Sequence, residues 1–132
     1  MVSSAIASVS GASAVLEGAI VTYATSVKGR FLDIDPAILY EIGVVSPECA
    51  KAMAEGAAKL FQADTAIAVT GYAGPGGGDE HNPVGTVYIA ATVFGNTTVR
   101  RLNLTGSRDE IRAAAAEESL SLMCEQISKT IG

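Results

Sequence analysis

The sequence has no tryptophan, one histidine and two cysteines, and only 5% of its residues are aromatic. Cys49 and Cys124 lie far apart and form no metal-ligand spacing, so we expect free thiols in a reducing cytosol. Basic residues are also scarce, since 9 Lys and Arg face 14 Asp and Glu for a net charge of −5. Because nucleic acids and anionic membranes both favour basic patches, we expect neither as a partner.

Long apolar runs and targeting signals are also missing, which predicts a cytoplasmic protein without a membrane anchor. What remains is a chain of 132 residues, 48% of them hydrophobic and many of them alanine or valine. That length predicts a single domain over residues 1–132. A chain of this size buries about two-thirds of the surface that its unfolded form exposes, enough for a true core.

Apolar runs of strand length alternate with helical patterns along the chain. The sequence predicts strands at residues 14–24, 65–70, 84–93 and 98–104, the last two joined as a hairpin at Gly95-Asn96. The run at 65–70 is continuously apolar, which is typical of a strand buried on both faces. The pattern therefore predicts an α/β fold, a three-layer α/β/α domain with a mixed sheet.

Two helix starts carry capping signals. Ser46 precedes Pro47, which suits an N-cap followed by proline at the first helical position. Ser107 with Glu110 three residues later forms a capping box, which predicts the start of the last helix. A further short helix is expected over residues 25–34.

Between the second and third predicted strands lies the segment "TGYAGPGGGDEHNPVGTVYI", residues 70–89. Its glycines permit backbone angles closed to other residues and let a ligand approach the main chain, whose N–H groups can bind an anion. We interpret it as a ligand-binding loop, with a flexible connection as the alternative. Asp79, Glu80 and His81 at its tip can in principle bind a metal, but a solvated acidic tip is the simpler interpretation, so no metal is expected.

Tyr23 and Lys28 form the second candidate cluster. A lysine desolvated near a strand end has a lowered pKa and can act as a base or an anion anchor. A surface lysine beside a half-buried tyrosine explains the same residues and is favoured by the sequence taken alone.

Three long segments resemble the CinA C-terminal domain family, the competence/damage-inducible proteins that include nicotinamide-nucleotide amidohydrolases of the PncC type. They are "GASAVLEGAIVTYATSVKGRFLDI", "GVVSPECAKAMAEGAAKLFQADTAIAVTGYAGPGGG" and "NPVGTVYIAATV". The resemblance implies an α/β/α fold with a mixed sheet. It also implies hydrolysis of the carboxamide of nicotinamide mononucleotide to nicotinic acid mononucleotide and ammonia, without a cofactor, in a homo-oligomer that we expect to be a dimer.

The resemblance also implies the site. Tyr23 and Lys28 match the family's Y-x-x-x-x-K as candidate bases, with the choice between them open. Ser46 matches the serine of its G-A-V-S, and Ser46 or Thr70 would orient the amide. The residues that match the nucleotide-pocket motifs T-G-x-A-G-P-x-G-G and P-V-G-T are Thr70, Gly71, Ala73, Gly74, Pro75, Gly77, Gly78, Pro83, Val84, Gly85 and Thr86.

Two departures from the family pattern matter. Asn82 stands where the family often has lysine, which removes one positive charge near the loop. The E-S-C-T-G-G motif, whose serine is the family's nucleophile, is absent, and its expected place is immediately before Met1. The first strand is therefore expected to be missing as well. We consider three explanations for this absence. The one that we favour is a start codon assigned to an internal methionine; the others are a natural truncation and an artefact of production.

Two functions are thus expected from the sequence. The first is an amidohydrolase that is inactive in this short form because the nucleophile is missing. The alternative is a catalytically dead nucleotide-binding or oligomerisation module of a CinA-like protein. A third and weaker option is a C-terminal partner for a separate pyrophosphatase-like domain.

Overall fold

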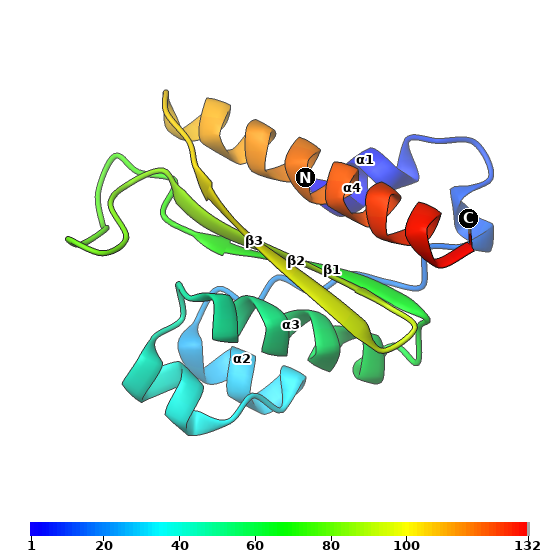
Figure 1. Ribbon diagram of the computed structural model, residues 1–132, viewed down its shortest axis with the longest axis horizontal. Helices are drawn as coiled ribbons and strands as arrows, with labels where there is room; N and C mark the ends of the chain where they lie inside the picture. Colours follow the sequence, from blue (N-terminus) through cyan, green and yellow to red (C-terminus); the bar gives the residue numbers. More distant parts are fainter. Residues whose placement is uncertain (132) are drawn as a thin grey trace.

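A three-stranded sheet lies between two layers of helices in the computed structural model, which describes residues 1–131 (Figure 1). Helix α4 covers one face of the sheet, with α1 against α4, and α3 with α2 behind it covers the other face. In chain order the elements are α1 (Val2–Ala7), the 3₁₀ turn η1 (Ala12–Ala14), α2 (Thr25–Leu32), the π-helical turn η2 (Ile38–Ile42), α3 (Pro47–Leu60), β1 (Thr65–Gly71), β2 (Thr86–Val93), β3 (Asn96–Asn103) and α4 (Arg108–Ile131). The predicted α/β fold with three layers is confirmed.

Strand β2 lies at the centre of the sheet and is buried along its whole length. Its side chains alternate between two apolar clusters because successive residues of a strand point to opposite faces. Tyr88 and Ala90 pack toward α3, whereas Ile89 and Val93 pack toward α4. Both faces are thus covered by helices, which explains why the sequence here is almost continuously apolar.

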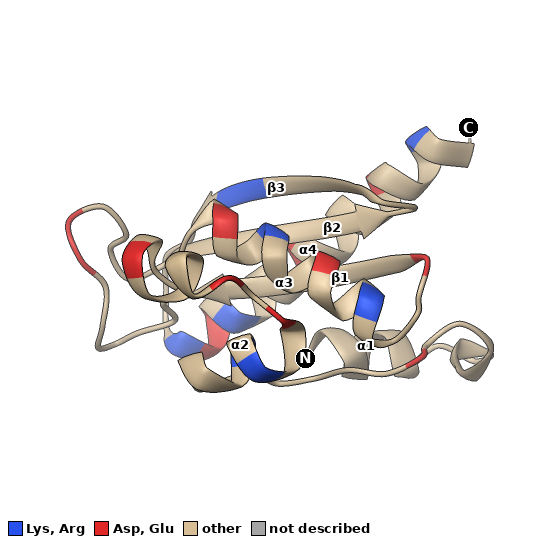
Figure 2. Ribbon diagram, turned by 90° about the horizontal axis from the view of Figure 1, so that it is seen from below, with Lys and Arg blue, Asp and Glu red and all other residues tan. Residues whose placement is uncertain are grey.

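The register places three polar side chains side by side across the sheet, on the face that α3 covers. Thr70 of β1 is opposite Tyr88 of β2, and Tyr88 is opposite Arg101 of β3. This row lies at the end of the sheet where β1 leaves for the glycine loop. The loop comprises residues 72–85 and projects beyond the sheet with acidic residues at its tip (Figure 2).

The predicted strand over residues 14–24 is wrong. After η1 the chain runs extended through residues 16–23, but within residues 1–131 no other segment pairs with it. Val15, Val21 and Tyr23 are 73%, 85% and 87% exposed. The residues suit a strand, yet a strand also requires a partner for its backbone groups. The paired strands of the described chain are consequently antiparallel rather than mixed, and β1 has one free edge.

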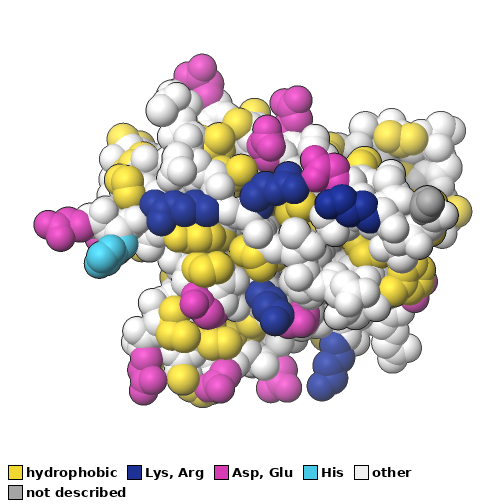
Figure 3. All heavy atoms as spheres, viewed as in Figure 1, with side chains coloured by type: hydrophobic (Ala, Val, Ile, Leu, Met, Phe, Trp, Pro, Cys, Tyr) yellow, Lys and Arg dark blue, Asp and Glu magenta, His cyan; other side chains and the backbone are white. Residues whose placement is uncertain are grey.

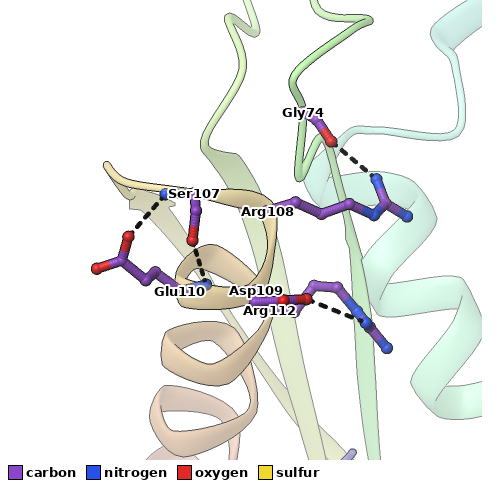
Figure 4. Close-up of polar contacts among 6 residues, drawn as sticks. All are labelled: Gly74, Ser107, Arg108, Asp109, Glu110 and Arg112. Carbon is purple, nitrogen blue, oxygen red and sulfur yellow. Dashed lines mark hydrogen bonds and ion pairs between the residues drawn. The ribbon is translucent and has the colours of Figure 1, made fainter.

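Both predicted helix caps are confirmed. The Ser46 hydroxyl accepts a hydrogen bond from the backbone N–H of Cys49, and Pro47 begins α3. At α4 the Ser107 hydroxyl accepts from the N–H of Glu110, whose carboxylate accepts from the N–H of Ser107 (Figure 4). None of the helices described in residues 1–131 is both long and apolar enough to cross a bilayer.

The hairpin between β2 and β3 turns at Phe94-Gly95, one residue earlier than predicted, because Val93 pairs with Asn96. Phe94 and Gly95 have φ of 47° and 84°, which is the geometry of a type I′ turn. A phenylalanine held at positive φ, and 60% exposed, is strained without a compensating contact in the core.

Phe94→Asn should therefore stabilise the protein, because asparagine tolerates positive φ and Asn-Gly is a preferred type I′ pair. We expect a gain of about 1 kcal/mol in the free energy of unfolding, measured by urea denaturation. Phe94→Val is the control, since a β-branched residue strains the same position. Equal effects of both variants would contradict the explanation from backbone strain.

Candidate functional site

The turn that precedes α3, residues 43–46, is the point where the predicted site residues meet. Three polar side chains from different parts of the chain donate hydrogen bonds to successive carbonyl groups of this turn. Ser46 donates to the carbonyl of Gly43 at 2.7 Å, Thr70 to that of Val44 at 2.7 Å and Asn82 to that of Val45 at 3.2 Å. The turn thereby joins the start of α3, the end of β1 and the glycine loop.

Ser46 is 6% exposed and its hydroxyl is used twice. It donates to the Gly43 carbonyl and accepts from the Cys49 N–H at 3.1 Å. A nucleophilic serine needs a base to take its proton, and here that proton is directed at a carbonyl. The geometry therefore makes Ser46 a cap of α3 and a brace for the turn.

Lys28, on α2, lies against the first turn of α3. It is 7% exposed, its ammonium group donates to the carbonyl of Thr22, and burial lowers its pKa, an effect that the nearby Cys49 partly offsets. Cys49 is fully buried, and burial raises the pKa of its thiol. A lowered pKa increases the neutral fraction of the Lys28 amine, the form in which it acts as a base.

The burial of Lys28 predicts a specific pH dependence of stability. Because the folded pKa lies below the unfolded value near 10.5, the unfolded state binds more protons between these two pKa values, and stability rises with pH there. Lys28→Met should remove this contribution. We expect the melting temperature of the wild type to improve relative to the variant as the pH rises from 7 toward 10.5, measured by circular dichroism.

Lys51→Met is the matched control, because Lys51 is an exposed lysine on α3. Its melting temperature should follow the wild type at every pH. A constant difference between wild type and Lys28→Met across the range would contradict the burial of a charged amine.

Tyr23 is placed differently from Lys28. Its side chain is 87% exposed and extends into solvent from the unpaired segment, one residue beyond the Thr22 carbonyl that Lys28 contacts. The structure thus brings Lys28, Ser46 and Thr70 to one region, with the Tyr23 ring outside it.

The glycines of the loop and Gly71, which ends β1 just before it, serve two different purposes. At Gly71 and Gly85 a Cβ atom would lie 2.6 Å and 2.0 Å from the carbonyl oxygens of Thr86 and Leu104, so these glycines allow close backbone packing. Gly76 and Gly77 instead lie in the exposed part of the loop, and Gly77 has a φ of 88°. Bare backbone accessible to a ligand is therefore concentrated at Gly76 and Gly77.

The remaining predicted binding residues lie in or beside the loop. Ala73 packs on the α4 side of the sheet, Gly74 is buried, and Pro75 is exposed. A Cβ at Gly78 would lie 2.8 Å from the backbone nitrogen of Val84, so Gly78 also serves packing. Thr86 begins β2 and is 1% exposed, and its hydroxyl has no hydrogen-bond partner among residues 1–131.

Two arginines that were not predicted from the sequence hold the loop. Arg108, the first residue of α4, donates to the carbonyl of Gly74 at 2.9 Å (Figure 4). Arg101, on β3, donates to the carbonyl of His81 at 2.8 Å. Neither contact leaves a local signal in the sequence, because each joins residues that are 20 or more positions apart.

The acidic tip of the loop is organised by Asp79. One oxygen of its carboxylate accepts from the backbone N–H groups of His81 and Asn82, at 2.9 and 2.8 Å. Over the described part of the chain, no three His, Cys, Asp or Glu side chains gather as a metal site would require.

Comparison with known proteins gives consistent matches. A family model described as "CinA C-terminal domain" matches residues 1–127. A "CinA-like protein" of Mycobacterium marinum is 42% identical over 120 residues, which are 90% of this chain and 28% of the relative. One from Desulfotalea psychrophila is 42% identical over 113 residues, or 86% and 27% of the two chains. The chain thus spans little more than a quarter of the length of these curated relatives.

Solved structures agree with the sequence matches. The competence/damage inducible protein CihA of Agrobacterium tumefaciens has a TM-score of 0.91 and 35% identity, covering 94% of this chain and 76% of that one. A protein from Klebsiella pneumoniae described as a member of the Competence-Damaged Protein (CinA) superfamily has a TM-score of 0.92 and 29% identity, covering 97% and 80%.

Proposed function

The chain belongs to the CinA C-terminal domain family, and from this premise we propose that it carries the nucleotide site of a nicotinamide-nucleotide amidohydrolase. The proposed ligand is nicotinamide mononucleotide, with its phosphate and ribose against the exposed part of the glycine loop. In this 132-residue chain we propose binding with negligible hydrolysis. A cytoplasmic location is part of the same proposal.

The observation that carries the proposal is the convergence on residues 43–46. Thr70, Ser46 and Asn82 hold this turn through its carbonyls, and Lys28 lies beside the helix that follows. A desolvated amine beside the helix whose preceding turn contacts the glycine loop is a suitable combination for a phosphorylated amide substrate. The loop supplies N–H donors for the anion, and the amine supplies a base.

Hydrolysis of the amide needs more than these groups. A nucleophile must attack the carbonyl, and fixed N–H donors must stabilise the oxyanion that forms. The Ser46 hydroxyl is directed at the Gly43 carbonyl, and the E-S-C-T-G-G motif is absent from the sequence. These two observations favour the alternative of a nucleotide-binding module without turnover for the 132-residue chain.

Titration calorimetry with nicotinamide mononucleotide tests the binding proposal directly. Thr70→Val removes the hydroxyl while keeping the shape, and should weaken binding about tenfold because the Val44 carbonyl loses its partner. Thr97→Val, on β3 and away from residues 43–46, should leave the affinity unchanged. No detectable binding to the wild type would rule out the proposed ligand.

We also propose that the chain self-associates. The support is the free edge of β1, which offers unpaired backbone groups to another strand. Sedimentation velocity should show a dimer or larger species at micromolar concentration, and a monomer throughout would contradict this proposal.

A further inference from the structure

A chain of hydrogen bonds crosses the sheet from β3 to the turn that precedes α3. Arg101 donates to the Tyr88 hydroxyl at 3.2 Å, Tyr88 donates to the Asn82 side-chain oxygen at 2.9 Å, and Asn82 donates to the Val45 carbonyl at 3.2 Å. Asn82 belongs to the glycine loop, so this chain of bonds ties the loop to the site on one side and to the outer strand on the other.

The direction of every bond in this chain is fixed by chemistry. The Val45 carbonyl can only accept, so Asn82 must present its NH₂ group there and its oxygen to Tyr88. The tyrosine hydroxyl must then donate to that oxygen, and it accepts from Arg101, which has no acceptor atom. Reversing one member breaks two contacts at once.

The Arg101 guanidinium makes further contacts that hold it in this position. Its remaining nitrogens donate to the carbonyl of His81 at 2.8 Å and to Asn103 at 3.2 Å. Its guanidinium also lies over the Tyr88 ring, 5.7 Å from the centroid. Within residues 1–131 it forms an ion pair with no carboxylate, in contrast to its neighbour Arg100, which pairs with Glu125 at 2.8 Å.

Lys and Arg side chains gather in a row over β3 and α4 on one face of the molecule (Figure 3). Arg100 and Arg101 are adjacent on β3 and point to opposite faces of the sheet. Arg100 reaches α4 at an exposed ion pair, whereas Arg101 reaches the loop. The two residues therefore form a natural matched pair, alike in type and strand but different in what they contact.

We propose that Arg101 is a positioning residue that, through Tyr88 and Asn82, holds the second half of the glycine loop against residues 43–46 in the conformation that binds the ligand. This inference rests on the proposed function for the identity of the ligand, nicotinamide mononucleotide. The positioning itself is a property of the free protein. Arg101 acts on the loop, and the loop residues are the ones proposed to contact the ligand.

The first test is hydrogen exchange of the free protein, followed by mass spectrometry. In Arg101→Ala the amides of residues 79–82 should exchange at least about tenfold faster than in the wild type. The variant loses the charged hydrogen bond to the His81 carbonyl and the contact with Tyr88 that supports Asn82. Exchange in β2 and α3 should stay unchanged. Arg100→Ala should leave the loop at the wild-type rate.

Asn82→Asp distinguishes positioning of the loop through the hydrogen bonds of Asn82 from simple charge attraction between residue 82 and Arg101. The aspartate has nearly the same shape and would attract Arg101, but its carboxylate cannot donate to the Val45 carbonyl. The proposal predicts faster loop exchange in Asn82→Asp as well, with melting temperature within a few degrees of the wild type. Arg101→Lys should restore only part of the protection, because lysine lacks the planar fork of donors.

The second test is affinity for nicotinamide mononucleotide by calorimetry. Arg101→Ala and Asn82→Asp should each bind about tenfold more weakly than the wild type and than Arg100→Ala. If the amides of residues 79–82 exchange in Arg101→Ala at the same rate as in the wild type, the proposal is overturned. If the wild type does not bind the nucleotide, the proposed function fails, while the exchange result still decides the positioning role.

Discussion

The 132-residue chain should release ammonia from nicotinamide mononucleotide about six orders of magnitude more slowly than a form extended at its N-terminus by a segment that carries E-S-C-T-G-G. The reason is chemical, since acyl transfer needs a nucleophile whose proton a base can take. Ser46 lies in residues 43–46, but its hydroxyl is already engaged, because it donates to the Gly43 carbonyl and accepts from the Cys49 N–H. A coupled assay for ammonia measures the difference directly.

Ser46→Ala in the short chain is the decisive control for this prediction. The variant loses the cap of α3 and should lower stability by about 1 kcal/mol, without changing the background rate of ammonia release. Measurable amidase activity in the short chain that disappears in Ser46→Ala would make Ser46 the nucleophile. The structural role of Ser46 and the catalytic role proposed for the E-S-C-T-G-G serine would then both be wrong.

Gly77→Val should abolish binding of nicotinamide mononucleotide, with at least about a 100-fold loss of affinity. Gly77 has a φ of 88°, a conformation that a β-branched residue avoids, and its Cβ would lie 3.2 Å from Cδ1 of Tyr72. The loop must therefore change its backbone conformation, and its N–H groups then no longer lie where we propose that they bind the phosphate. Thermal shift with the nucleotide at roughly a thousandfold excess over the wild-type Kd detects the loss.

Gly11→Val provides the matched control for the loop variant. Gly11 has a φ of 89° and an open environment, with no heavy atom within 4 Å of the position that a Cβ would take, and it lies outside the glycine loop. The strain from positive φ is the same in both variants, so a general loss of stability should affect both melting temperatures. A full nucleotide-induced shift in Gly77→Val would exclude this part of the loop as the phosphate site.

Features set by local sequence could be predicted well. The caps at Ser46 and Ser107 depend on residues within one helical turn, and both are confirmed. The strand β1 and the hairpin follow from apolar runs and a turn signal, but the prediction that residues 65–70 are buried on both faces is wrong, because β1 is only partly buried and the fully buried strand is β2. The hairpin turn was displaced by one residue because Phe94 adopts positive φ, which its residue type does not favour.

Features set by distant partners could not be predicted. Residues 14–24 have the composition of a strand, but pairing depends on a neighbour that composition does not reveal. For the same reason Arg101 and Arg108 could not be recognised as contacts of the glycine loop, whose carbonyl groups lie far from them along the chain. The resemblance to the family supplied Thr70 and Ser46, and the structure added the shared turn at residues 43–46.

The unequal connections of β2 have a consequence for the order of folding. A two-residue turn joins β2 to β3, whereas the loop of residues 72–85 separates β2 from β1. Closing the short turn costs less chain entropy, so the hairpin should form before β1 docks. Phe94→Asn should then accelerate refolding in stopped-flow experiments, while substitutions in the loop should mainly change the unfolding rate. The loop of residues 72–85, which we assign to ligand binding, would thus become ordered after the hairpin. Substitutions in this loop would leave the folding nucleus intact.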